Sequence, residues 1–256
     1  MSELTAHDIA FSYGTAAILE GVSFDVKPGE LVAILGPNGM GKTTFLKCIN
    51  HILTPKRGTI MVGEDSVTDL TPRQIAQRIG YVEQQRTGTQ MTVFNAVLLG
   101  RKPYITWDVT ERDLEIVNEA LHTLGLQKFA MRRLNQLSGG ELQKVVIARA
   151  IAQQPEVLLL DEPTNNLDLK NQVEVLDVVR HLVDKHRTAS VVVIHDLNLA
   201  LRYADRFLLM KDKKVFAFGG PEVMTEANIE AVYDVDVSMI TQEGLTVVVP
   251  FSTKGN

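Results

Sequence analysis

The feature that most constrains this chain is the run Gly36-Pro37-Asn38-Gly39-Met40-Gly41-Lys42-Thr43, which fits the pattern G-x-x-x-x-G-K-[ST]. It follows the apolar residues 31–35 and precedes an amphipathic stretch that begins at Lys42. Glycines let the backbone turn several N–H groups towards one anion, and a following helix adds the positive end of its dipole. We therefore predict a strand, a phosphate-binding loop and a helix in this order.

Composition limits the remaining possibilities. The 256 residues are 45% hydrophobic and 22% charged, which suits a folded α/β protein of ordinary polarity. A formal net charge of -5 argues against broad affinity for nucleic acid or anionic lipid. The first residues have neither a basic nor an apolar segment, so no signal peptide is expected. The single cysteine, Cys48, fits a reducing compartment and a place in the core.

The order of predicted elements suggests an α/β protein with an inserted helical block. Short β-type runs occupy residues 4–13, 22–26, 31–35, 59–62 and 79–82. Residues 92–154 have a helical pattern, in which Leu114, Val117, Leu121 and Leu124 share one face of a helix capped by Thr110. Further strands are expected at residues 157–160, 189–194, 207–210, 215–218 and 245–249.

Acidic and basic side chains follow two of the buried strands. Asp161 and Glu162 come directly after residues 157–160, and His195 follows residues 189–194. Two adjacent carboxylates at a strand end point to opposite sides, so that one can hold magnesium and the other can activate water. Ligands bind where parallel strands end, so His195 is a candidate contact for a terminal phosphate.

Three other positions each leave two interpretations open. Ser138-Gly139-Gly140-Glu141 fits a capping box, and its two glycines favour a second anion-binding backbone over a simple helix start. Tyr13 is either a half-buried strand residue or a platform on which adenine stacks. Tyr104 and Trp107 either pack within the helical block or contact a partner.

These residues together resemble the nucleotide-binding subunit of ABC transporters over essentially the whole chain. Residues 36–43 resemble its Walker A loop, 137–141 its signature motif, 157–162 its Walker B strand and 166–168 its D-loop. Gln84 is similar in position to the Q-loop glutamine, His195 to the switch histidine and Tyr13 to the adenine-stacking aromatic.

The resemblance implies ATP and Mg²⁺ as cofactors and assigns residue roles. Glu162 would be the general base, helped by His195, Lys42 and Gln84, while Thr43, Gln84 and Asp161 would hold Mg²⁺. The nucleotide would be bound by Tyr13, Gly36, Pro37, Asn38, Gly39, Gly41, Lys42, Thr43, Thr44, Ser138, Gly139 and Gly140.

The resemblance also implies an architecture and an assembly. The expected fold is a P-loop NTPase (RecA-like) core with an antiparallel β subdomain, formed by residues 1–84 and 155–256, and a helical subdomain at residues 85–154. Two copies would form a head-to-tail homodimer, each ATP lying between residues 36–43 of one copy and 138–140 of the other. The implied partners are transmembrane permease subunits and, indirectly, an extracytoplasmic substrate-binding protein. The chain would be a peripheral protein at the cytoplasmic face of the membrane, and it would bind no nucleic acid.

Finer features suggest a class of transported substrate. Residues 92–101, 194–200 and 203–206 are similar to the ATPases that energise import of iron-siderophore, haem or cobalamin chelates. The alternatives are an importer of molybdate or tungstate, an exporter, and an ABC ATPase that acts on nucleic acid or ribosomes. Glu83 stands where the family commonly has proline, and Tyr104 stands where many members have histidine. Both departures bear on the identification of the transported substrate and not on catalysis.

Overall fold

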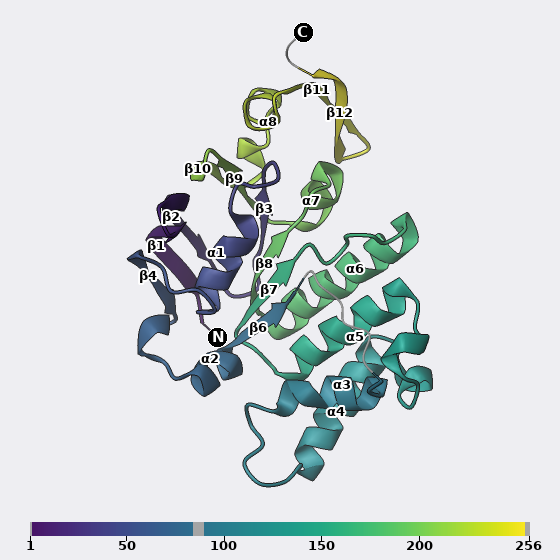
Figure 1. The fold of residues 1–256 in the computed structure, drawn as a ribbon. Helices are drawn as coiled ribbons and strands as arrows, with labels where there is room; N and C mark the ends of the chain where they lie inside the picture. Colours follow the sequence, from purple (N-terminus) through teal and green to yellow (C-terminus); the bar gives the residue numbers. More distant parts are fainter. Residues whose placement is uncertain (1, 84–89, 254–256) are drawn as a thin grey trace.

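Three strands that are apolar almost throughout form the centre of the main sheet. They are β3 (Leu31–Leu35), β7 (Val157–Asp161) and β8 (Ala189–Val193), and every residue in them is buried. Strands covered on both faces need such sequences. The computed structural model describes residues 2–83 and 90–253, and in it these strands lie in the order β3-β8-β7 (Figure 1).

The main sheet has six strands in the order β10-β9-β3-β8-β7-β6. The five strands from β9 to β6 pair in parallel, and only β10 is antiparallel to its neighbour. The outer strands are β6 (Ile79–Val82), β9 (Arg206–Lys211) and β10 (Lys214–Gly219). The parallel strands therefore end at one common edge, where the sequence places the polar residues.

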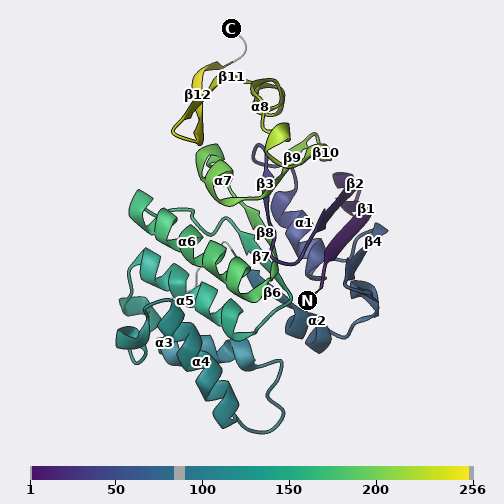
Figure 2. The ribbon, with the colours of Figure 1, turned by 180° about the vertical axis from the view of Figure 1, so that it is seen from behind.

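Alternate residues of the main sheet pack into two separate cores. Leu31, Ala33 and Leu35 belong to a core that includes α4 to α8, whereas Val32 and Ile34 belong to one that includes α1. Figure 2 shows from behind that α6 and α5 lie on one side of the sheet and α1 on the other. The helices that border the sheet are α1 (Lys42–Ile49), α2 (Pro72–Arg78), α5 (Gly139–Ala152), α6 (Leu169–His186) and α7 (Leu197–Tyr203).

A second sheet of four antiparallel strands covers α1, in the order β2-β1-β4-β5. Phe24 from this sheet meets Phe45 of α1 edge-on, with ring centroids 5.2 Å apart. The strands are β1 (Leu4–Tyr13), β2 (Ala16–Val26), β4 (Arg57–Val62) and β5 (Asp65–Ser66). The expected α/β fold, with its antiparallel sheet and helical block, is confirmed.

The helical block consists of α3 (Val93–Leu98), α4 (Glu111–Thr123) and α5. Thr110 caps α4 as expected, and Val117 and Leu121 are buried. Leu114, on the same face near the start of α4, is 38% exposed. The inner position next to it is taken by Asp113.

Asp113 is buried because it pairs with a buried cation. Arg101 Nε lies 2.8 Å from Asp113 Oδ1, and both side chains are 6% exposed. The same guanidinium donates to the carbonyl of Ala152 at the end of α5, 2.9 Å away, while Thr110 donates to the other oxygen of Asp113. This ion pair therefore joins α4 to α5 and to the short helix η2 (Leu99–Arg101).

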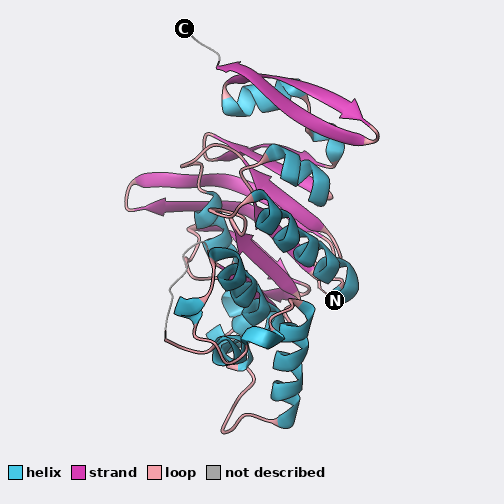
Figure 3. Ribbon diagram, turned by 90° about the vertical axis from the view of Figure 1, so that its right-hand side faces the viewer, coloured by secondary structure: helices cyan, strands magenta, loops and turns pink. Residues whose placement is uncertain are grey.

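The chain ends in a helix and a hairpin: α8 (Glu226–Tyr233), β11 (Val235–Gln242) and β12 (Leu245–Thr253). Figure 3 shows these elements at one end of the molecule. A helix near residues 226–232 and the second strand were expected from the sequence. The first strand was not, since aspartates at 234 and 236 interrupt its pattern.

We predict that replacing Asp113 by Asn lowers the free energy of unfolding by about 3 kcal/mol, because it leaves Arg101 as a buried unpaired charge. The Arg101 hydrogen bond lowers the pKa of Asp113. The stabilisation should therefore be complete above the pKa of an unfolded aspartate, about 4, and disappear at more acid pH. Urea unfolding at pH 7 and at lower pH measures both effects.

The control is Glu115→Gln on the same helix, where the partner Arg112 lies 3.1 Å away and both side chains are more than half exposed. This change should cost less than about 0.5 kcal/mol. Equal losses for the two variants would contradict the role given to the Arg101–Asp113 pair.

Candidate functional site

The phosphate loop lies between β3 and α1, and its glycines have backbone conformations that other residues rarely adopt. Gly36, Gly39 and Gly41 have φ values of 143°, 82° and 89°. A Cβ atom on Gly36 would stand 2.4 Å from the carbonyl oxygen of Met210 in β9, and one on Gly41 would stand 2.8 Å from that of Ile18 in β2. Two neighbouring strands therefore approach the loop so closely that only glycine fits at these positions.

The ammonium group of Lys42 folds back onto the loop. Its Nζ donates to the carbonyl oxygens of Gly36 and Pro37, at 2.7 and 2.8 Å. Lys42 is only 5% exposed, and this burial lowers its pKa, while the nearby carboxylates of Glu162 and Asp161 act in the opposite direction. The amine is thus held at the loop by two weak acceptors that an anion could replace.

Asp161 at the end of β7 faces the first turn of α1. Thr43 Oγ1 donates to Asp161 Oδ1 at 3.1 Å, and the hydroxyl of Tyr81 in β6 donates to Oδ2 at 3.3 Å. Burial raises the pKa of Asp161, and the Thr43 hydrogen bond partly offsets this. Sequence reasoning missed Tyr81, whose only signal is its place in the strand expected at residues 79–82.

Glu162 points to the other side, towards the end of β8. Its Oε1 lies 2.5 Å from Nε2 of His195, and Asn165 Nδ2 donates to its Oε2 at 3.0 Å. The expected divergence of the two adjacent carboxylates is therefore present in the structure. Glu162 has a positive φ of 50°, an uncommon conformation for a residue other than glycine. Asn165, in the loop after β7, was not singled out from the sequence.

The structure brings together the side chains of Lys42, Thr43, Asp161, Glu162 and His195 at the carboxyl edge of the sheet. The remaining loop residues expected to touch the nucleotide surround them in the β3–α1 connection and the first turn of α1: Pro37, Asn38, Gly39 and Thr44. Gln84 lies outside the described residues.

The signature residues lie elsewhere in the chain. Ser138 caps α5 in a box with Glu141, as expected, and α5 packs on the face of the sheet opposite α1. Ser138 and Gly139 are exposed. A Cβ on Gly140 would stand 2.4 Å from Oδ1 of Asn171 in α6, a side-chain atom that can move aside, so this contact does not by itself require glycine.

The aromatic candidates differ in their surroundings. Tyr13 ends β1 and is 54% exposed, with its ring packed edge-on against Phe11 at 4.9 Å. Tyr104 is a packing residue, because its hydroxyl donates to the carbonyls of Gln77 and Gln153, each 3.0 Å away. Trp107 is 96% exposed, which excludes a packing role for it in this chain. Cys48 is buried, as expected, and burial raises its pKa to about 11.

Residues 19–165 match the ABC transporter family. The chain is 53% identical over 247 residues to an uncharacterized ABC transporter ATP-binding protein of Methanocaldococcus jannaschii, covering 96% of this chain and 97% of the other. It is 41% identical over 226 residues to the cobalamin import ATP-binding protein BtuD of Halobacterium salinarum, covering 88% of this chain and 57% of that protein.

A similar solved structure is that of a transporter described as of the metal-chelate type, in an inward-facing conformation. The two chains align with a TM-score of 0.86 and 30% identity, over 98% of each. Within residues 2–83 and 90–253, the structure contains no helix with both the length and the apolar character needed to cross a bilayer. The chain belongs to the ABC transporter family and is an ATP-binding subunit, an ATPase coupled to transport.

Proposed function

We propose that this chain hydrolyses MgATP at the seam between two copies and thereby energises import of a metal chelate through a separate permease. The observation that carries the proposal is the pairing of Glu162 with His195 beside Asp161, Thr43 and Lys42. ATP-binding cassettes of this family work as dimers with membrane permeases.

The chemistry assigned to each residue follows from its contacts. Lys42 and the loop N–H groups would neutralise the phosphates, with Lys42 exchanging its carbonyl acceptors for phosphate oxygens. Glu162 would take a proton from the attacking water, since His195 and Asn165 hold its two oxygens in fixed positions. His195, 41% exposed in its side chain, would contact the γ-phosphate.

The donor atoms near Asp161 fit a magnesium ion. A buried carboxylate and a threonine hydroxyl are hard oxygen ligands, and Gln84 would add an amide oxygen. In the described part of the chain, no three His, Cys, Asp or Glu residues are grouped to hold a metal. A magnesium ion held here by Asp161, Thr43 and Gln84 would offset the negative charge of the phosphates.

The separation of the signature from the phosphate loop supports a head-to-tail homodimer. Ser138 and Gly139 are exposed at the start of α5, on the far side of the sheet from α1. The positive end of the α5 dipole at this exposed helix start would complete the site of the other copy, where ATP would lie between the two motifs.

A groove between the sheet core and the helical block is the proposed docking place for the permease. Its volume is about 830 Å³, and its lining includes Ile52, Arg73, Glu83, Leu99 and Lys102. Glu83 directly precedes the expected Q-loop glutamine, so a segment bound here would be close to the nucleotide site. Trp107 lies on the loop that leaves the groove at Lys102 and would be a further contact.

The class of transported substrate rests on kinship. A cobalamin importer and a metal-chelate transporter are among the similar proteins, so a chelate of this kind is the first choice over molybdate or tungstate. The chain would lie at the cytoplasmic face of the membrane, and an extracytoplasmic binding protein would deliver the substrate to the permease.

The function is tested by purifying the tagged chain from detergent-solubilised native membranes. We expect a polytopic membrane protein to copurify, and the complex in vesicles to take up radiolabelled cobalamin or a ferric siderophore only with internal MgATP. Copurification with ribosomes or nucleic acid, and no membrane protein, would contradict the proposal.

We predict that Glu162→Gln lowers ATP turnover by about 10² to 10⁴-fold, because glutamine cannot accept the proton. ATP affinity should be unchanged. Phosphate release and equilibrium ATP binding measure the two quantities, and Glu119→Gln, an exposed carboxylate on α4, is the control that should leave both unchanged. Normal turnover in Glu162→Gln would refute the general-base assignment.

Tyr13→Ala should weaken ATP binding by about 1 to 3 kcal/mol, the usual value of stacking a base on an aromatic ring. Trp107→Ala is the matched control, since it removes a more exposed aromatic ring from another part of the molecule. If both variants bind ATP like the wild type in titration calorimetry, Tyr13 is only a strand residue.

The same Trp107→Ala variant should keep the ATPase activity of the isolated chain but lose affinity for the permease by at least about 1 kcal/mol, as buried aromatic anchors do. The measurement is the amount of variant that copurifies with the permease relative to Tyr13→Ala. Equal recovery would remove Trp107 from the docking surface.

A further inference from the structure

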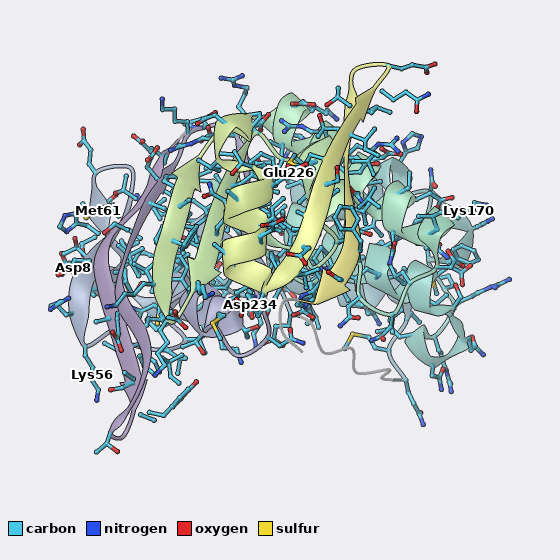
Figure 4. The ribbon with its side chains drawn as sticks, turned by 90° about the horizontal axis from the view of Figure 1, so that it is seen from above. Asp8, Lys56, Met61, Lys170, Glu226 and Asp234 are labelled. Atoms are coloured by element: carbon cyan, nitrogen blue, oxygen red, sulfur yellow. The ribbon has the colours of Figure 1, made fainter. Side chains whose placement is uncertain are left out.

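The C-terminal segment, residues 226–253, reaches the nucleotide edge of the sheet at two points. It comprises α8, β11 and β12 and follows all of the motifs discussed above in the sequence. Figure 4 shows α8, between the labelled Glu226 and Asp234, lying between the β9–β10 strands and the β11–β12 hairpin. None of the expected site residues comes from this segment.

The first point is a hydrogen bond from the phosphate loop to Tyr233, the last residue of α8. The N–H of Gly36 donates to the hydroxyl oxygen of Tyr233 at 2.8 Å. Gly36 is the first glycine of the loop, and on its other side the carbonyl of Met210 leaves no room for a Cβ. The backbone at Gly36 is therefore fixed between β9 and the end of α8.

The second point joins the hairpin to the helix that follows His195. The backbone N–H of Val248 in β12 donates to Asn198 Oδ1 at 2.7 Å, and Asn198 Nδ2 donates to the carbonyl of Val248 at 3.3 Å. The amide of Asn198 thus pairs with the strand as a neighbouring strand would. Asp196, directly after His195, caps the same helix by accepting from the N–H groups of Asn198 and Leu199.

Further contacts hold the segment itself in place. Lys211 at the end of β9 donates to the carbonyl of Ala231 and lies 3.2 Å from Asp234, at the C-terminal end of α8. The inner face of the hairpin is buried through Val237 and Val248, which belong to the same core as α7 and α8. The segment is therefore a packed part of the fold.

We propose that Tyr233 is a positioning residue for the phosphate loop and that Asn198 is one for α7, the helix that directly follows the switch histidine His195. The C-terminal segment then sets the place of both nucleotide-contacting elements relative to each other. This inference rests on the proposed ATPase site and extends it to residues that make no contact with nucleotide.

Removing the Tyr233 hydroxyl leaves the Gly36 N–H without its acceptor. The loop would then turn this N–H towards water, and ATP would have to restore the binding conformation. A hydrogen bond of this kind corresponds to about a two- to tenfold change in an equilibrium constant. Tyr233→Phe should therefore raise KM and Kd for MgATP by about that factor, with kcat at saturation unchanged.

Asn198→Ala should have the opposite pattern. It frees α7 from the hairpin without touching the phosphate loop, so kcat should fall about two- to tenfold while KM for MgATP stays the same. A general loss of folded protein would lower kcat in both variants. It would not raise KM in Tyr233→Phe alone and lower kcat in Asn198→Ala alone.

The experiment is steady-state hydrolysis and equilibrium binding of MgATP by the full-length chain, with thermal unfolding measured in parallel. Tyr203→Phe is the control, since its buried hydroxyl donates to Asp177 at 2.7 Å, away from the phosphate loop. It should lower stability similarly but leave KM unchanged. An unchanged KM in Tyr233→Phe, or an equal rise in Tyr203→Phe, would overturn the inference.

The wild-type result separates this inference from the function on which it rests. Absence of MgATP binding and turnover in the wild type would overturn both. Normal activity in the wild type and in Tyr233→Phe would overturn only the positioning role.

Discussion

The close approach of β9 and β2 to the phosphate loop is the constraint on which the rest of the site depends. The carbonyls of Met210 and Ile18 leave space only for glycine at 36 and 41, and both residues have the positive φ values that glycine tolerates. The helix that begins at Lys42 then presents its positive end at the same place. An anion site thus arises from strand packing before any side chain is considered.

The charged side chains at this edge are arranged as a site prepared for a polyphosphate. Lys42 is buried, and its ammonium group donates hydrogen bonds to the carbonyls of Gly36 and Pro37. Asp161 is 1% exposed, and burial raises its pKa. A phosphate would be a stronger partner for Lys42, and its cation a stronger partner for Asp161. These contacts would offset part of the free energy that burying the two charges costs.

Sequence reasoning succeeded where function depends on strand ends. Asp161, Glu162 and His195 could be placed near Lys42 because parallel strands end at one edge of a sheet. It failed where a contact joins segments far apart in the chain. Nothing near Tyr233 indicates that its hydroxyl reaches Gly36, and nothing near Asp113 indicates that it pairs with Arg101 of another helix.

The central claim is that two copies hold nucleotide between the phosphate loop of one and the signature of the other. It is tested most directly by mixing two hydrolysis-blocked variants, one with Asn38→Cys and one with Ser138→Cys. Both positions are exposed, whereas the native Cys48 is buried. We predict a disulfide between the two different chains that forms with MgATP and not without it. Absence of that cross-link with MgATP present would contradict the claim.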